Sequence, residues 1–143
     1  MKIAVLDADL IARKRHRFPN LVCIKLSGYH KSEGDEVTLK TDYVDLDKFD
    51  KVYIAKVFTN TKVPSEVLHR KNVLYGGTGF FYDKAVSLPY VIEHHMPDYA
   101  IGYLTRGCYR GCAFFVNRNA KRSEKHSSIA EFLSPDEGSA PAL

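Results

Sequence analysis

Short apolar runs alternate with polar stretches along the first half of the chain, and this pattern predicts an α/β fold. Residues 3–6, 51–58 and 72–75 are rich in the β-branched, aromatic and aliphatic residues that favour strands, and residues 37–39 form a weaker candidate. The run at residues 3–6 is continuous rather than alternating, which is typical of a strand buried on both faces of a parallel sheet. We therefore expect a small, open, mostly parallel sheet flanked by helices.

Helix signals lie between these strands. Asn20 is a good N-cap for a helix that begins near Leu21, and Gly34 stands where a C-cap glycine belongs. Cys23 lies within this helix, and we expect a buried structural thiol there because free cysteine behaves as a small hydrophobe. Residues 64–69 predict a second, shorter helix with a proline in its first turn.

Polar residues follow the first strand at its carboxyl end, where open α/β sheets bind ligands. Asp7 and Asp9 are in this position. A carboxylate there can also cap a turn or pair with a nearby arginine, and we favour one of these structural roles for Asp7. Residues 8–19 predict a polar, basic loop. The glycine-rich turn at residues 76–79 lacks the features of a phosphate-binding loop, so we favour a plain tight turn.

Composition and charge narrow the class of protein. The 143 residues suffice for one domain with a real core, and 45% hydrophobic with 27% charged residues is typical of a soluble protein. No apolar run approaches the roughly 18 residues that span a bilayer, and no secretory signal begins the chain, so we expect a cytoplasmic protein. The net charge of +4 is gathered in short basic loops that are usually just solvated, so nucleic acid is not an expected partner.

The second half of the chain begins with a connection rich in proline. Residues 80–99 predict a linker, with a helical turn near its end. A strand is expected at residues 100–106 and a helix at residues 127–133. The tail at residues 134–143 is rich in proline, glycine, serine and alanine, and we expect it to be disordered.

The strand at residues 100–106 leads into a loop that carries two cysteines. Cys108 and Cys112 are four residues apart, and an arginine and a glycine directly precede each of them. The glycines break regular structure, so the two thiols can converge on one metal centre. The arginines favour the thiolate, which is the form that binds metal. Three cysteines in all are too few for a disulfide framework, so we expect reduced thiols.

Residues 101–117 resemble the start of the radical S-adenosylmethionine (radical SAM) enzymes, in which a C-x-x-x-C-x-x-C loop after the first barrel strand holds a four-iron four-sulfur cluster. The match consists of a strand running into Thr-Arg-Gly-Cys, a second cysteine four residues on, an aromatic residue and then Val-Asn. The resemblance implies that Cys108 and Cys112 are the first two cluster ligands and that Phe114 packs near S-adenosylmethionine. The third ligand position is Phe115, whose ring cannot coordinate iron.

The resemblance extends more weakly over residues 1–133, because many radical SAM proteins carry a small domain similar to a cobalamin-binding domain before the barrel. The matching stretches are residues 2–7, 18–21, 29–31, 76–79 and 88–99. It implies an α/β domain at residues 1–79, a linker at 80–99 and, at 100–133, the first strand, loop and helix of an incomplete radical SAM barrel. The cobalamin pattern Asp-x-His-x-x-Gly is absent after Asp7, so cobalamin is not expected.

The resemblance implies a radical SAM-type iron–sulfur protein fragment that does not turn over substrate by itself, with an iron–sulfur cluster and S-adenosylmethionine as its cofactors. A separate chain would then supply the rest of the barrel. One alternative is a non-catalytic α/β binding or scaffold module that has lost the cluster. Another is a zinc site formed by Cys108, Cys112 and two of His94, His95 and His126, although these residues lack the regular spacing of a zinc motif.

Overall fold

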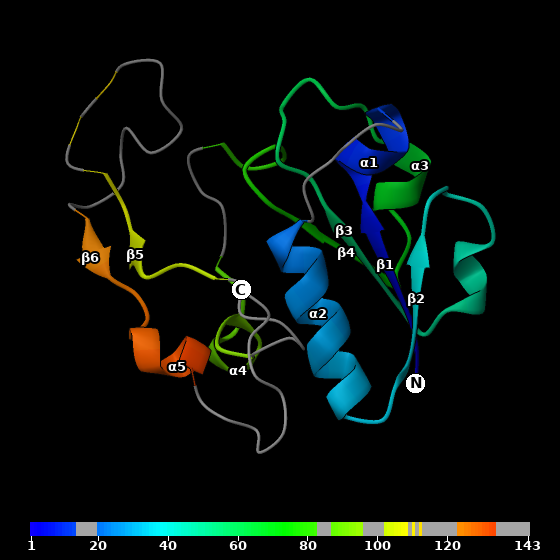
Figure 1. Ribbon diagram of the computed structural model, residues 1–143. Helices are drawn as coiled ribbons and strands as arrows, with labels where there is room; N and C mark the ends of the chain where they lie inside the picture. The colour runs from blue at the N-terminus through cyan, green and yellow to red at the C-terminus, as the bar shows by residue number, and fades with distance from the viewer. Residues whose placement is uncertain are drawn as a thin grey trace. The chain divides into compact units, whose positions relative to one another are not determined.

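The computed structural model describes residues 1–13, 20–82, 87–95, 102–108, 110, 112 and 123–133 (Figure 1). The chain divides into two compact units, Met1–His95 and Met96–Leu143. The helix α4 (Tyr90–Glu93) lies within the stretch predicted as a linker and belongs to the first unit. The predicted tail at residues 134–143 lies outside the described residues.

The first unit is built on a four-stranded sheet. Its strands are β1 (Lys2–Asp7), β2 (Glu36–Lys40), β3 (Lys51–Ala55) and β4 (Val73–Gly76), in the spatial order β2-β1-β3-β4. β1 pairs with β2 from Lys2↔Glu36 to Leu6↔Lys40, and with β3 from Ile3↔Lys51 to Asp7↔Ala55. These pairings and that of β3 with β4 are all parallel, which confirms the predicted α/β class and parallel sheet.

Helices cover both faces of this sheet. α1 (Ala8–Arg13), the 3-10 helix η1 (Leu46–Lys48) and α3 (Ser65–Leu68) contribute to one hydrophobic core, whereas α2 (Leu21–Ser32) and α4 contribute to the other. Ala4 and Leu6 of β1 point into the first core, and Ile3 and Val5 point into the second. All four are buried, which explains why this strand reads as a continuous apolar run.

The predicted helix caps are confirmed, and one predicted loop is partly wrong. The Asn20 side chain accepts a hydrogen bond from the Val22 N–H (3.1 Å), and Gly34 follows α2 with a φ of 80°. Residues 8–13 form α1 rather than a loop. Asp7 Oδ1 accepts the backbone N–H groups of Asp9 and Leu10, at 3.0 and 3.3 Å, and so caps the first turn of this helix.

The second unit contains a short antiparallel ribbon and a helix. β5 (Thr105–Arg106) pairs with β6 (Glu124–Lys125), and α5 (Ile129–Leu133) follows, which confirms the helix predicted at residues 127–133. Only the last two residues of the strand predicted at 100–106 are in a described strand. Among the described residues, β5 pairs with β6 alone, in a two-stranded sheet. The prediction that this strand is the first strand of a barrel is therefore not tested. No helix in the described part of the chain is long and apolar enough to cross a bilayer.

Candidate functional site

The cysteine loop begins where β5 ends. Gly107 has a φ of 94°, a left-handed conformation that glycine adopts without strain, and it turns the chain immediately before Cys108. Cys108 and Cys112 are both free thiols and both partly exposed. Because β6 runs antiparallel to β5, the two-stranded ribbon holds the two ends of residues 107–123 together. Both thiols therefore belong to a segment whose two ends are paired with each other.

Positive charge lies close to the two thiols along the chain. Arg106 and Arg110 are exposed, and each lies two residues before a cysteine. The guanidinium of Arg106 lies over the ring of Tyr103, 4.9 Å from its centroid, in a cation–π contact. The neighbourhood of the loop therefore carries positive charge.

The residues present do not supply a complete ligand set for a four-iron cluster of the radical SAM kind. The resemblance requires three thiolates, whereas this loop offers two and Phe115 has no donor atom. In the part of the chain that the structure describes, no three His, Cys, Asp or Glu side chains form a group that could hold a metal ion. Phe114 and Phe115 lie outside the described residues.

The register of the ribbon separates His126 from the cysteines. The backbone N–H of His126 donates to the carbonyl oxygen of Leu104 at 2.9 Å, so His126 lies beside Leu104, before the start of β5. Cys108 follows the other end of β5, beyond the turn at Gly107.

A second group of polar side chains lies at the carboxyl end of the parallel sheet. Because β2 and β3 lie on opposite sides of β1, this end of β1 and β3 is the topological switch point, where open α/β sheets bind ligands. Asp9 lies there and is 1% exposed. Its Oδ2 accepts the Val57 N–H at 2.7 Å, and its Oδ1 accepts the Thr61 hydroxyl. One carboxylate thus joins the segment after β1 to the segment after β3.

Lys56 lies directly after β3 and is buried. Its Nζ donates to the Thr61 carbonyl oxygen at 3.2 Å and lies 4.3 Å from the centroid of the Phe80 ring. The glycine turn packs on this residue so closely that a Cβ at Gly77 would lie 2.3 Å from the Lys56 carbonyl oxygen, and one at Gly79 would lie 2.7 Å from its Cγ. Close packing therefore accounts for these glycines without a bound phosphate.

Tyr43 adds a hydroxyl close to the two aspartates. This hydroxyl is buried and has no hydrogen-bond partner among the described residues. Burial, and then the negative charges of Asp9 and Asp7, raise the pKa of Tyr43 to about 12. The phenol therefore stays protonated at neutral pH.

The sequence predicted part of this group. It placed Asp7 and Asp9 at the carboxyl end of the sheet but missed Lys56, Thr61 and Tyr43. A signal existed for Lys56 and Thr61, because they follow a strand whose carboxyl end meets that of β1 in a parallel sheet. No comparable signal marks Tyr43, which precedes η1 in an irregular, acidic stretch.

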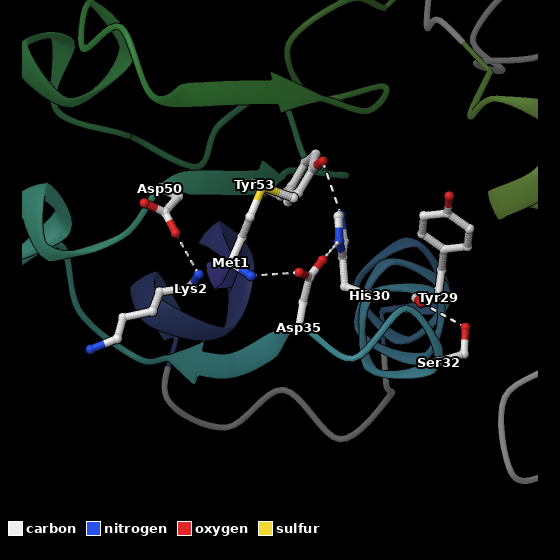
Figure 2. Close-up of polar contacts among 8 residues, drawn as sticks. All are labelled: Met1, Lys2, Tyr29, His30, Ser32, Asp35, Asp50 and Tyr53. Atoms are coloured by element: carbon white, nitrogen blue, oxygen red, sulfur yellow. Dashed lines mark hydrogen bonds and ion pairs between the residues drawn. The ribbon is translucent and has the colours of Figure 1, made fainter.

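A third polar group joins α2 to the amino ends of the strands (Figure 2). His30 Nδ1 lies 2.7 Å from Asp35 Oδ2, and His30 Nε2 lies 3.1 Å from the Tyr53 hydroxyl. Asp35 Oδ1 accepts a hydrogen bond from the Met1 ammonium group at 2.7 Å. The hydrogen bond from Met1, followed by that from His30, lowers the pKa of Asp35. These contacts link the end of α2 to β1, β2 and β3.

Comparisons with known proteins do not assign this chain to a family. No family model matches it, and neither a curated protein nor a solved structure does so. The fold and its sites define an α/β unit with a parallel sheet, which a two-cysteine loop follows in the chain.

Proposed function

We propose that residues 1–133 are the N-terminal region of a cytoplasmic radical SAM-type iron–sulfur protein, and that this region does not catalyse a reaction by itself. The observation that carries the proposal is the cysteine loop, in which Cys108 and Cys112 keep the family's C-x-x-x-C spacing directly after a strand. The parallel α/β unit that precedes the loop supports it, because the resemblance implies a domain of this class there.

Phe115 is the reason that autonomous catalysis is not part of the proposal. With a ring at the third ligand position, two thiolates would leave one iron without the protein ligand that the family pattern provides. We therefore assign no catalytic step to a cluster or to S-adenosylmethionine in this chain, and we do not propose cobalamin. A complete barrel would need strands from a further polypeptide segment, such as a separate chain.

A non-catalytic α/β binding or scaffold module is the second candidate. One observation favours it: polar side chains at the switch point bond to one another. Asp9 is bonded to Thr61 and Val57, and Lys56 is bonded to Thr61 and lies on Phe80. Polar groups that are used internally in this way stabilise the fold and are not available to a ligand without rearrangement, so this observation favours the scaffold form of the second candidate over the binding form.

Anaerobic reconstitution with iron and sulfide tests the first candidate. The chain would be compared with Phe115→Cys, with Phe115→Ala as a control that removes the ring without adding a thiol. We expect Phe115→Cys to retain about four iron atoms per chain, the stoichiometry of a cubane cluster, with its visible absorption band. We expect the unaltered chain and Phe115→Ala to retain little iron after desalting.

The possible outcomes separate the candidates. Loss of the cluster from a Cys108→Ser, Phe115→Cys double variant would show that the loop holds it. A stable cluster in the unaltered chain would overturn the claim that the region cannot work by itself, since another donor would then replace Phe115. Failure of every variant to hold iron would overturn the radical SAM assignment and favour the scaffold module.

A further inference from the structure

We propose that Cys108 and Cys112 form a reversible disulfide within the loop, which makes this loop a redox-responsive dithiol. The proposal starts from the incomplete ligand set. Two free, partly exposed thiols share a loop in which the third ligand position is Phe115. Two thiols without a third ligand are still a complete set for disulfide formation. The proposal therefore rests on the thiols themselves and not on the binding of a cluster.

The spacing of the cysteines suits a disulfide once the chain turns between them. A disulfide requires Cα atoms about 4.4–6.8 Å apart, whereas four extended residues would span about 13–14 Å. Gly111 lies between the cysteines, and glycine adopts turn conformations at little steric cost. Gly107 already turns the chain out of β5 just before Cys108. The entropy cost of closing so short a segment is small.

The third cysteine provides a contrast within the same chain. Cys23 is 6% exposed in α2, and its Sγ lies 3.6 Å from the Leu6 carbonyl oxygen. Burial, and then the charges of Asp7 and Asp9, raise the pKa of Cys23 far above its usual range. Because the thiolate is the nucleophile and an oxidant must reach it, Cys23 should not react, whereas an oxidant can reach the partly exposed loop thiols. The structure thus separates one buried thiol from two accessible thiols.

The oxidation balances with a peroxide as the oxidant. One thiolate attacks a peroxide oxygen, the O–O bond breaks, and the sulfur becomes a sulfenic acid while the departing hydroxide takes a proton to form water. The second thiolate then attacks that sulfur, the S–S bond forms, and hydroxide leaves as a second water. Each thiol loses one electron and one proton overall. A dithiol reductant reverses the step through a mixed disulfide.

The proposed disulfide and a metal at this loop are mutually exclusive, because thiolates are the metal ligands and an S–S bond consumes them. In a reducing compartment, disulfides are usually transient and redox-sensing rather than structural. The proposed role is therefore regulatory: oxidation removes both thiolates of the loop together, and reduction restores them together.

Peptide mapping of the full chain tests the proposal. The reduced, chelator-treated protein would be titrated with hydrogen peroxide, alkylated and digested with trypsin. Cleavage after Arg106 and Arg110 separates the two cysteines into residues 107–110 and 111–118, so only a disulfide keeps these peptides together. Cys23 lies in a third peptide, residues 18–25. We expect the linked pair in the oxidised chain and its loss after treatment with dithiothreitol.

Matched variants define the outcomes. Cys23→Ser should still form the linked peptides, whereas Cys108→Ser should abolish them. The linked peptides should also form faster in the folded chain than in the chain unfolded in urea. Separately oxidised or alkylated loop cysteines, cross-links to Cys23, dimers between chains, or equal rates in both states would overturn the proposal. None of these results depends on iron, so failure of the disulfide and failure of the reconstitution with Phe115→Cys are distinguishable.

Discussion

Substitution of Asp9 tests whether the polar side chains at the switch point have a structural or a ligand-binding role. Asp9→Ala removes the acceptor of the Val57 N–H and of the Thr61 hydroxyl. If the carboxylate joins the ends of β1 and β3, this variant should be markedly less stable than the unaltered chain. If it is instead kept for a ligand at the expense of stability, the variant should be as stable or more stable.

The expected loss of stability follows from the two donors that Asp9→Ala leaves without an acceptor. Leaving a buried donor without a partner costs about 1–3 kcal/mol. Thr61 is 5% exposed and should incur much of this cost, whereas the Val57 N–H is only partly buried and can recover some of it from water. We therefore expect a loss of about 2–4 kcal/mol in the free energy of unfolding. The free energy of unfolding of a native domain is about 5–15 kcal/mol in all, so the expected loss is a large share of it.

Urea unfolding followed by circular dichroism measures this change. Asp47→Ala is a suitable control, because Asp47 is exposed and forms an ion pair with Arg70, whose loss should cost less than about 1 kcal/mol. Asp9→Asn keeps one acceptor and should fall between the two. A double-mutant cycle of Asp9→Ala with Thr61→Val should show a coupling energy of about 0.5–3 kcal/mol. An Asp9→Ala variant no less stable than Asp47→Ala would refute the structural role.

Two further predictions concern the glycine turn and the amino end of the sheet. Gly77→Ala should lower the free energy of unfolding in urea by more than Gly34→Ala does. Both glycines have a positive φ, which costs about 1–2 kcal/mol with alanine, but of the two only Gly77 lies against a backbone oxygen. Equal losses for the two variants would contradict this account. Asp35→Asn should be less stable than the unaltered chain at neutral pH. Because the pKa of Asp35 is lower in the folded chain, the carboxylate's contribution to stability is present above the unfolded pKa of about 3.9 and is lost as the pH falls through the folded pKa. A stability difference between the two chains that stayed constant from pH 7 to pH 3 would argue against this role of Asp35.

The elements that the sequence predicted are those whose signals are local. The continuous apolar run of β1 and the Asn20 cap of α2 depend on neighbouring residues, so they could be recognised without the fold. α1 was missed because it has only six residues, too few to show a helical period, and its first turn is capped by Asp7 at the end of β1. β6 was missed because a two-residue Glu124–Lys125 strand has no apolar pattern and exists through its pairing with β5.

The candidate sites divide in the same way. The cysteine spacing is local and was read directly, and the position of Asp9 followed from the end of the first strand. Its bonds to Val57 and Thr61 span about fifty positions of sequence and depend on β3 lying beside β1. The predicted strand at residues 51–58 also ended early, at Ala55. The Lys56 N–H still donates to the Gly76 carbonyl oxygen of β4, but the next N–H, that of Val57, donates to the Asp9 carboxylate instead of to a strand. Such contacts depend on the tertiary structure, so a local sequence pattern cannot predict them.

The central place of β1 in the sheet has a consequence for synthesis on the ribosome. Both of its neighbours, β2 and β3, are translated after it, and the core that covers its two faces is complete only when later segments have emerged. At 5–20 residues per second, the interval from the end of β1 to the end of β3 lasts roughly 2–10 s. Until β2 emerges, the most apolar strand of the sheet has no strand partner, and until β3 follows it is paired along one edge alone. The helices α1 and α2 emerge before both partners, so they are the first elements able to shield β1 from aggregation or chaperone binding.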